Sequence, residues 1–283
     1  MSVSHIVSTD WVLKRLETGE LVLADVRFSP KDADYGRRAY EQGHIPGAVF
    51  VDFKADLTAP AGEHGGRSPL PSPERLSERF GQLGIDRSTT VVIYEDGNGP
   101  AAARLWWVLR YLGHDDVHVL DGGYSAWTAA GLLVSDELPA PQPRQFAAEP
   151  RPQLLADVRE VRTAAERPGT VLVDSRDLNQ YLGLEAPFDP VAGHIPGAVH
   201  YFWKDALTEN GAWKPAQDLQ ERFRGIADAQ EVIVYCGSGI SATPNVLALT
   251  EAGVKNVKLY AGSWSDWISY PDNPIATGEE GEA

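Results

Sequence analysis

Short apolar runs alternate with longer amphipathic stretches along the whole chain. The apolar runs are compact and rich in β-branched residues, as in strands that are buried in a parallel sheet. They lie at 22–25, 91–94, 117–120, 171–174, 232–235 and 257–260. The stretches between them predict helices at 8–17, 73–83, 101–112 and 242–252, several of which follow a Ser or Thr cap or end at Gly. This alternation predicts an α/β fold, an open parallel sheet with helices on both faces.

The pattern occurs twice. "GHIPGAV" stands at 43–49 and again at 193–199, and "VVIYEDGNGPAA" (91–102) is answered by "VIVYCGSGISAT" (232–243). A Pro-rich segment without apolar periodicity separates the two copies. We therefore expect two tandem domains of the same fold, at residues 1–140 and 153–283, joined by a linker at 141–152.

Composition limits the possible functions. The chain has 283 residues, of which 43% are hydrophobic, and a net charge of −15. Its acidity argues against nucleic-acid and membrane partners, and no apolar run is long enough to span a bilayer. The N-terminus lacks a secretory pattern, so a cytoplasmic location is expected. Nothing in the sequence calls for a metal or an organic cofactor.

The only cysteine, Cys236, directly follows an apolar run in "YCGSGISATPN". A single cysteine forms no internal disulfide and no multi-cysteine metal site. A loop between a strand and a helix lies at the carboxyl end of the sheet, where ligands bind. Gly237 and Gly239 permit unusual backbone angles, and the positive end of the helix favours an anion. The alternative, a buried structural cysteine, would not need glycines and serines around it. We therefore predict a thiolate nucleophile, with Ser241 as the N-cap of the following helix.

These residues resemble the tandem-domain rhodanese family of sulfurtransferases. The resemblance rests on both "GHIPGA" segments, on "DSR" before the second one, on "CGSGISA" and on "AGSWSDW", and it covers about residues 5–275. It implies that Cys236 carries a sulfane sulfur as a persulfide between a small-molecule donor and an acceptor such as cyanide, a thiol or thioredoxin. Glu95 stands in place of the cysteine in the first copy, which implies a catalytically silent domain.

The resemblance also implies roles for other residues. The persulfide cradle and substrate site would comprise Gly237, Ser238, Gly239, Ile240, Ser241, Arg176, Gln180 and Arg67. The mercaptopyruvate branch implies a proton relay of Ser238, His44 and Asp34, although the repeated "GHIPGA" favours a structural histidine. The family arginine that contacts the donor is replaced by Gln180, and Asp189 stands where a further basic residue is expected. Arg176 and Arg67 are the candidate replacements.

Two alternatives share this architecture. Cysteine phosphatases need an arginine six residues after the cysteine to clamp phosphate, and this chain has Ala242 there. The intact Cys236 loop argues against the second alternative, a non-enzymatic rhodanese-like module for protein interaction or sulfur relay. The sequence therefore favours a sulfurtransferase, with "CGSG" closer to the mercaptopyruvate branch than to thiosulfate enzymes, which carry basic residues in the loop.

Overall fold

The computed structural model describes residues 4–19 and 21–279. The chain divides into two compact units. Unit 1 consists of Met1–Thr58, Pro71–Arg151 and Leu207–Trp213, and unit 2 consists of Ala59–Leu70, Pro152–Ala206 and Lys214–Ala283. Each unit thus contains a short segment from the other half of the sequence, a feature that differs from the expected division at 1–140 and 153–283.

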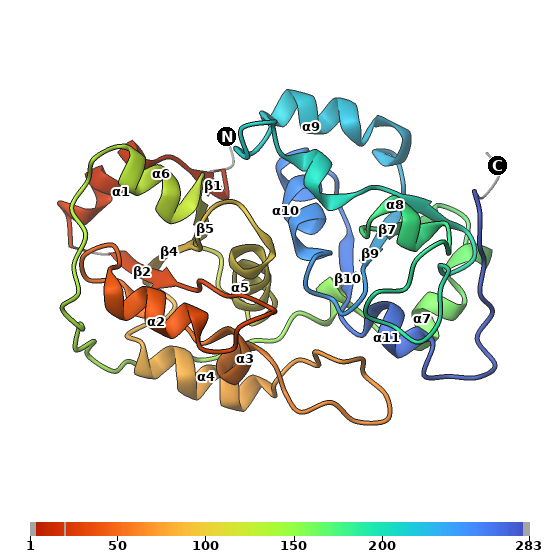
Figure 1. The fold of residues 1–283 in the computed structure, drawn as a ribbon, viewed down its shortest axis with the longest axis horizontal. Coiled ribbons are helices and arrows are strands. Elements are labelled where there is room, and N and C mark those ends of the chain that lie inside the picture. Colours follow the sequence, from red (N-terminus) through yellow and green to blue (C-terminus); the bar gives the residue numbers. More distant parts are fainter. Residues whose placement is uncertain (1–3, 20, 280–283) are drawn as a thin grey trace. The chain divides into compact units, whose positions relative to one another are not determined.

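Unit 1 contains the expected alternation of strands and helices (Figure 1). Its elements are β1 (Ile6–Val7), α1 (Thr9–Leu16), β2 (Leu21–Asp25), α2 (Tyr35–Gln42), β3 (Val49–Phe50), α3 (Phe53–Leu57), α4 (Pro73–Gln82), β4 (Thr90–Tyr94), α5 (Pro100–Tyr111), β5 (Val117–Leu120) and α6 (Gly123–Ala129). Ser8 caps α1 by accepting a hydrogen bond from the Trp11 amide, and Ser72 caps α4 in the same way.

Unit 2 repeats this order with additional 3₁₀ turns. Its elements are η1 (Pro152–Leu154), β6 (Leu155–Ala156), α7 (Val158–Arg162), η2 (Ala164–Glu166), β7 (Thr170–Asp174), α8 (Leu178–Tyr181), β8 (Ala198–His200), η3 (Trp203–Ala206), α9 (Ala216–Arg222), η4 (Arg224–Ile226), β9 (Glu231–Tyr235), α10 (Thr243–Glu251), β10 (Val257–Tyr260) and α11 (Ser263–Trp267).

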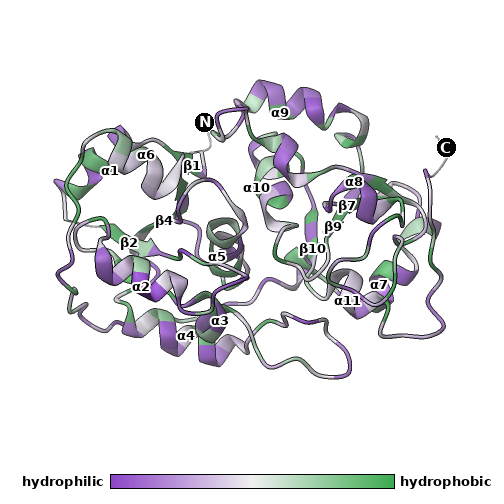
Figure 2. Ribbon diagram, viewed as in Figure 1, coloured by the Kyte–Doolittle hydropathy of each residue, from purple (hydrophilic) through white to green (hydrophobic). Residues whose placement is uncertain are grey.

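The two sheets have the same topology. Among the described residues, each is a parallel five-stranded sheet, with the strand order β1-β5-β4-β2-β3 in unit 1 and β6-β10-β9-β7-β8 in unit 2. The predicted fold class, two tandem open parallel sheets with flanking helices, is therefore confirmed. Figure 2 shows the hydropathy pattern that underlies this fold. Strands such as β9 carry hydrophobic colours, while surface helices such as α4 and α9 are largely hydrophilic.

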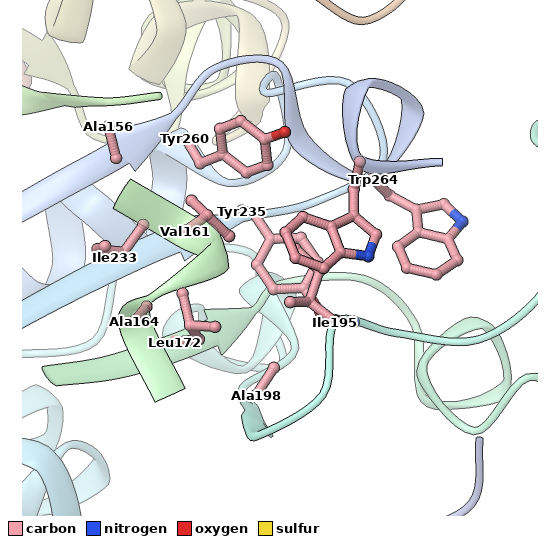
Figure 3. Packing of buried hydrophobic residues seen from close by; sticks show 11 residues of the cluster. Ala156, Val161, Ala164, Leu172, Ile195, Ala198, Ile233, Tyr235, Tyr260 and Trp264 are labelled. Carbon is pink, nitrogen blue, oxygen red and sulfur yellow. Dashed lines mark hydrogen bonds between the residues drawn. The ribbon is translucent and has the colours of Figure 1, made fainter. Parts of the chain in front are cut away.

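Each unit has its own apolar core against one face of its sheet. In unit 2, side chains from β7 and β9 meet those of α7 and α11, as Figure 3 shows. Tyr235 and Trp264 are fully buried there, next to the cysteine and to the N-terminus of α11. The core therefore includes side chains of β9, which precedes the Cys236 loop, and of α11, whose N-terminus contacts that loop.

The segment expected as a linker, 141–152, lies mostly along unit 1. The Arg144 amide donates to the Gly81 carbonyl over 2.9 Å, and the Glu149 amide donates to the Leu112 carbonyl over the same distance. Phe146 is 5% exposed. These contacts fix a segment that has no apolar periodicity.

No helix among residues 4–19 and 21–279 is long and apolar enough to cross a membrane.

Candidate active site

Cys236 lies at the carboxyl end of β9, in the loop that leads to α10. The side chain is 1% exposed and forms no disulfide. Its sulfur accepts a hydrogen bond from the Gly239 amide, with N and Sγ 3.1 Å apart. A backbone N–H is therefore already aimed at the atom on which negative charge would reside, an arrangement that stabilises a thiolate or a persulfide anion.

Gly239 allows this turn because of its backbone angle. Its φ is +75°, and a Cβ there would lie 2.1 Å from the Ala261 carbonyl oxygen. An L-residue is disfavoured at this φ, and here it would also collide with backbone atoms. The glycine at 239 is therefore what lets the loop fold back on the sulfur.

The N-terminus of α11 holds the other side of the loop. The Trp264 amide donates to the Cys236 carbonyl over 2.9 Å, and the Ser265 amide donates to the Gly237 carbonyl over 3.0 Å. The hydroxyl of Ser263 accepts from the Cys236 amide over 3.1 Å and lies 4.0 Å from Sγ. Sequence reasoning missed Ser263 and Ser265 as members of the site.

A signal for Ser263 was present in the repeat. "LDGGYSAW" and "LYAGSWSDW" align Gly123 with Ser263, and both residues have φ +55°. A non-glycine residue in this region stores backbone strain, which concentrates at functional sites. Unit 2 thus keeps a hydroxyl beside the cysteine at the position where unit 1 has no side chain.

The prediction that Ser241 caps the following helix is wrong. Helix α10 begins at Thr243 with Ala242 in the N-cap position, and the Ile240 carbonyl accepts from both the amide and the hydroxyl of Thr243. The loop takes one more turn before the helix starts. Ser241 is half-buried and Ser238 is 9% exposed in mid-loop, so their roles at the persulfide stay predictions.

Arg67 lies directly against the cysteine loop. A Cβ at Gly237 would be only 2.5 Å from Arg67 Nη2, and the guanidinium forms an ion pair with Asp189. Burial raises the pKa of the Asp189 carboxyl, while Arg67 and Arg176 act in the opposite direction. The structure therefore brings together Arg67, Asp189 and the Cys236 loop within unit 2.

Arg176 is occupied by internal contacts. It is 5% exposed, its guanidinium forms a two-pronged ion pair with Asp174, and its Nη2 donates to the Gly193 carbonyl over 2.7 Å. Burial alone would lower the pKa of Arg176, but Asp174 outweighs burial and raises it. Arg27, with Asp25 and the Gly43 carbonyl, forms the same arrangement in unit 1. The recurrence in both units favours a structural role for Arg176.

Gln180 lies in the short helix α8 and is half-buried. Its backbone carbonyl accepts from the Gly183 amide. The side chain can offer only a neutral amide to a ligand.

His44 is fully buried in unit 1. Its Nδ1 lies 2.8 Å from the Tyr40 carbonyl and its Nε2 lies 3.1 Å from the Glu137 carbonyl, while its ring stacks on Tyr40. His194 stacks on Tyr181 and contacts that residue's carbonyl in the same manner. This parallel favours a structural histidine in both copies. Asp34 is exposed at the start of α2, so the relay of Ser238, His44 and Asp34 stays a prediction.

Glu95 occupies the position in unit 1 that Cys236 occupies in unit 2. Its carboxylate accepts from the Ala102 amide over 2.9 Å, at the start of α5. Burial raises its pKa to about 7, although the amides of Ala102, Ala101 and Gly99 act to lower it. The carboxylate thus fills the backbone cradle of its own loop.

The chain is similar to known proteins over most of its length. A family model described as "Rhodanese-like domain" matches residues 8–130 and 157–270. A protein named "Probable 3-mercaptopyruvate sulfurtransferase" from Pseudomonas aeruginosa is 40% identical over 99% of this chain and 100% of its own length. Thiosulfate sulfurtransferase of Rattus norvegicus is 32% identical, covering 98% of this chain and 97% of its own. The crystal structure of SseA from Escherichia coli, a 3-mercaptopyruvate enzyme, has a TM-score of 0.81 and 32% identity, and the match covers 93% of this chain and 100% of SseA.

Proposed function

The chain belongs to the rhodanese-like family, and on that premise we propose that it is a sulfurtransferase that carries sulfane sulfur on Cys236. The observation that carries the proposal is the 3.1 Å hydrogen bond from the Gly239 amide to Sγ, in a loop whose shape depends on that glycine. In a persulfide the negative charge lies on the outer sulfur, one atom beyond Sγ. Backbone donors are suited to it because they need no proton transfer.

The reaction balances in two steps. With 3-mercaptopyruvate, the Cys236 thiolate attacks the donor sulfur, the C–S bond breaks, and its electron pair leaves as the enolate of pyruvate, which takes up a proton. A second nucleophile, such as cyanide, a small thiol or thioredoxin, then attacks the outer sulfur and releases the thiolate. This is covalent ping-pong catalysis. The free thiol that it requires is best preserved in a reducing compartment, so we place the reaction in the cytoplasm.

We propose 3-mercaptopyruvate as the better donor. The residues after Cys236 are Gly237 and Ser238, so the loop offers no positive side chain of its own to a compact dianion such as thiosulfate. A departing enolate, by contrast, needs a proton, and we propose that the hydroxyl of Ser238 assists its delivery.

Arg67 is the residue that we assign to the donor's anionic group. It contacts Gly237 and its side chain is 35% exposed, whereas Arg176 is buried and paired with Asp174. Gln180 stands where a charged arginine guanidinium is expected, and it offers only a neutral amide to the donor's anionic group. We therefore expect a high KM for both donors.

Steady-state kinetics with both donors test the donor assignment. We expect a higher kcat/KM for 3-mercaptopyruvate than for thiosulfate, and a lower KM for both in Gln180→Arg. The matched control is Asn179→Arg, which adds the same charge at the exposed neighbouring position. A higher kcat/KM for thiosulfate in the wild-type protein would refute the argument from the loop.

A further inference from the structure

Two opposite charges lie next to Gly237, the residue after the nucleophile. The Arg67 guanidinium and the Asp189 carboxylate form an ion pair, with side chains 35% and 5% exposed. A Cβ at Gly237 would lie 2.5 Å from Arg67 Nη2 and 3.7 Å from Asp189 Oδ2. A donor whose anionic group lies beside Gly237 would therefore be close to both charges.

The backbone of Arg67 is fixed relative to the cysteine loop. Its amide donates to the Ser265 hydroxyl over 3.1 Å, and the Ser265 amide donates to the Gly237 carbonyl. The Gly65 amide donates to Asp266 Oδ1 over 2.7 Å. Two hydrogen bonds to α11 thus hold the segment 59–70, so the position of the Arg67 backbone does not depend on the ion pair with Asp189.

Two arginines near the cysteine loop are each paired with an aspartate. Arg176 is neutralised by Asp174, and Arg67 is neutralised by Asp189. An incoming anion therefore meets an attractive and a repulsive charge at similar range. The repulsive charge is the more deeply buried of the two, where solvent screens it less.

We propose that Asp189 is a specificity-determining residue, whose carboxylate offsets Arg67 and so disfavours dianionic sulfur donors relative to monoanionic ones. The inference rests on the proposed function. Coulomb energy is proportional to the charge of the ligand. The repulsion that Asp189 exerts on thiosulfate is therefore about twice, in energy, that which it exerts on the single carboxylate of 3-mercaptopyruvate.

The test is the donor ratio of Asp189→Asn, a nearly isosteric change. If removal of the charge raises kcat/KM about fivefold for 3-mercaptopyruvate, it should raise it about 25-fold for thiosulfate, because the energies double. Both gains should shrink as ionic strength rises. Asp228→Asn changes the net charge equally at an exposed position of unit 2 and should leave the ratio unchanged.

Arg67→Gln gives a second test, which does not require Asp189→Asn to fold. It should lower kcat/KM for both donors, and more steeply for thiosulfate, while the double variant should return toward the wild-type ratio. Equal changes for both donors, or a rise in KM for both in Asp189→Asn, would overturn the proposal and make Asp189 only a support for Arg67. Absence of sulfur transfer from either donor in the wild-type protein would instead refute the proposed function.

Discussion

Gly239→Ala is the change that the loop geometry predicts to be most damaging for its size. The new methyl group would lie 2.1 Å from the Ala261 carbonyl oxygen, 2.8 Å from its carbon and 2.9 Å from its Cα. All three are backbone atoms of Ala261, which follows β10, so there is no flexible side chain that could move aside to make room for the methyl group. The loop itself must shift, and the Gly239 amide must move away from Sγ.

Gly239→Ala is expected to change two quantities, the free energy of folding and kcat. A non-glycine residue at φ +75° costs about 1–2 kcal/mol of folding free energy. Loss of one backbone donor to a developing anion typically lowers kcat about 100- to 1000-fold. The first quantity measures strain, and only the second reports on catalysis.

Gly253→Ala separates the two quantities. Gly253 follows α10 with φ +85°, and a Cβ there would meet nothing within 4 Å. This variant should show the conformational cost, with wild-type kcat.

The assay is sulfur transfer to cyanide at saturating donor, with urea unfolding measured on the same samples. We expect Gly239→Ala to lose at least about 100-fold in kcat while it stays folded. A kcat within a few-fold of wild type in a folded Gly239→Ala protein would refute the role of the Gly239 amide.

Two further predictions concern the first half of the chain. Burial raises the pKa of Glu95 to about 7, above its usual 4.5. Between these two pH values the folded protein keeps a proton that the unfolded chain releases. The contribution of this proton to the free energy of unfolding is therefore fully present below about pH 4.5 and is lost as the pH rises through 7. Glu95→Gln should reduce the difference in Tm between pH 5 and pH 8 and leave sulfur transfer within a few-fold of wild type; an unchanged pH dependence of Tm would contradict this. A chain beginning at residue 141 should not turn over, because it lacks Arg67 and the rest of the 59–70 segment that belongs to unit 2, and full activity of that fragment would contradict this.

The strands, and the position of Cys236 in a loop directly after β9, could be predicted from the sequence because their signals are local. The predicted run 117–120 coincides with β5, and 257–260 coincides with β10. The family resemblance was likewise carried by contiguous motifs around Cys236. Helix ends were less accurate, as Ser241 shows, because the start of α10 depends on the hydrogen bonds of Ile240 and not on the presence of a capping residue.

The rest of the site could not be predicted, because it depends on contacts between distant segments. Arg67 and Asp189 are separated by 122 positions, and their pairing is fixed by the docking of Gly65 and Arg67 on α11. No local pattern marks segment 59–70 as a part of unit 2. Ser263 was identifiable in principle, but only by comparing the two copies residue by residue.

The central claim is that Cys236 is the sulfur carrier, and intact-protein mass spectrometry after incubation with 3-mercaptopyruvate or thiosulfate alone tests it most directly. We expect the wild-type protein to gain about 32 Da, one sulfur atom, and to lose it on addition of cyanide. Cys236→Ser should gain nothing and transfer nothing. Sulfur transfer that persists in Cys236→Ser, or turnover by a wild-type protein that never carries the added sulfur, would contradict the account.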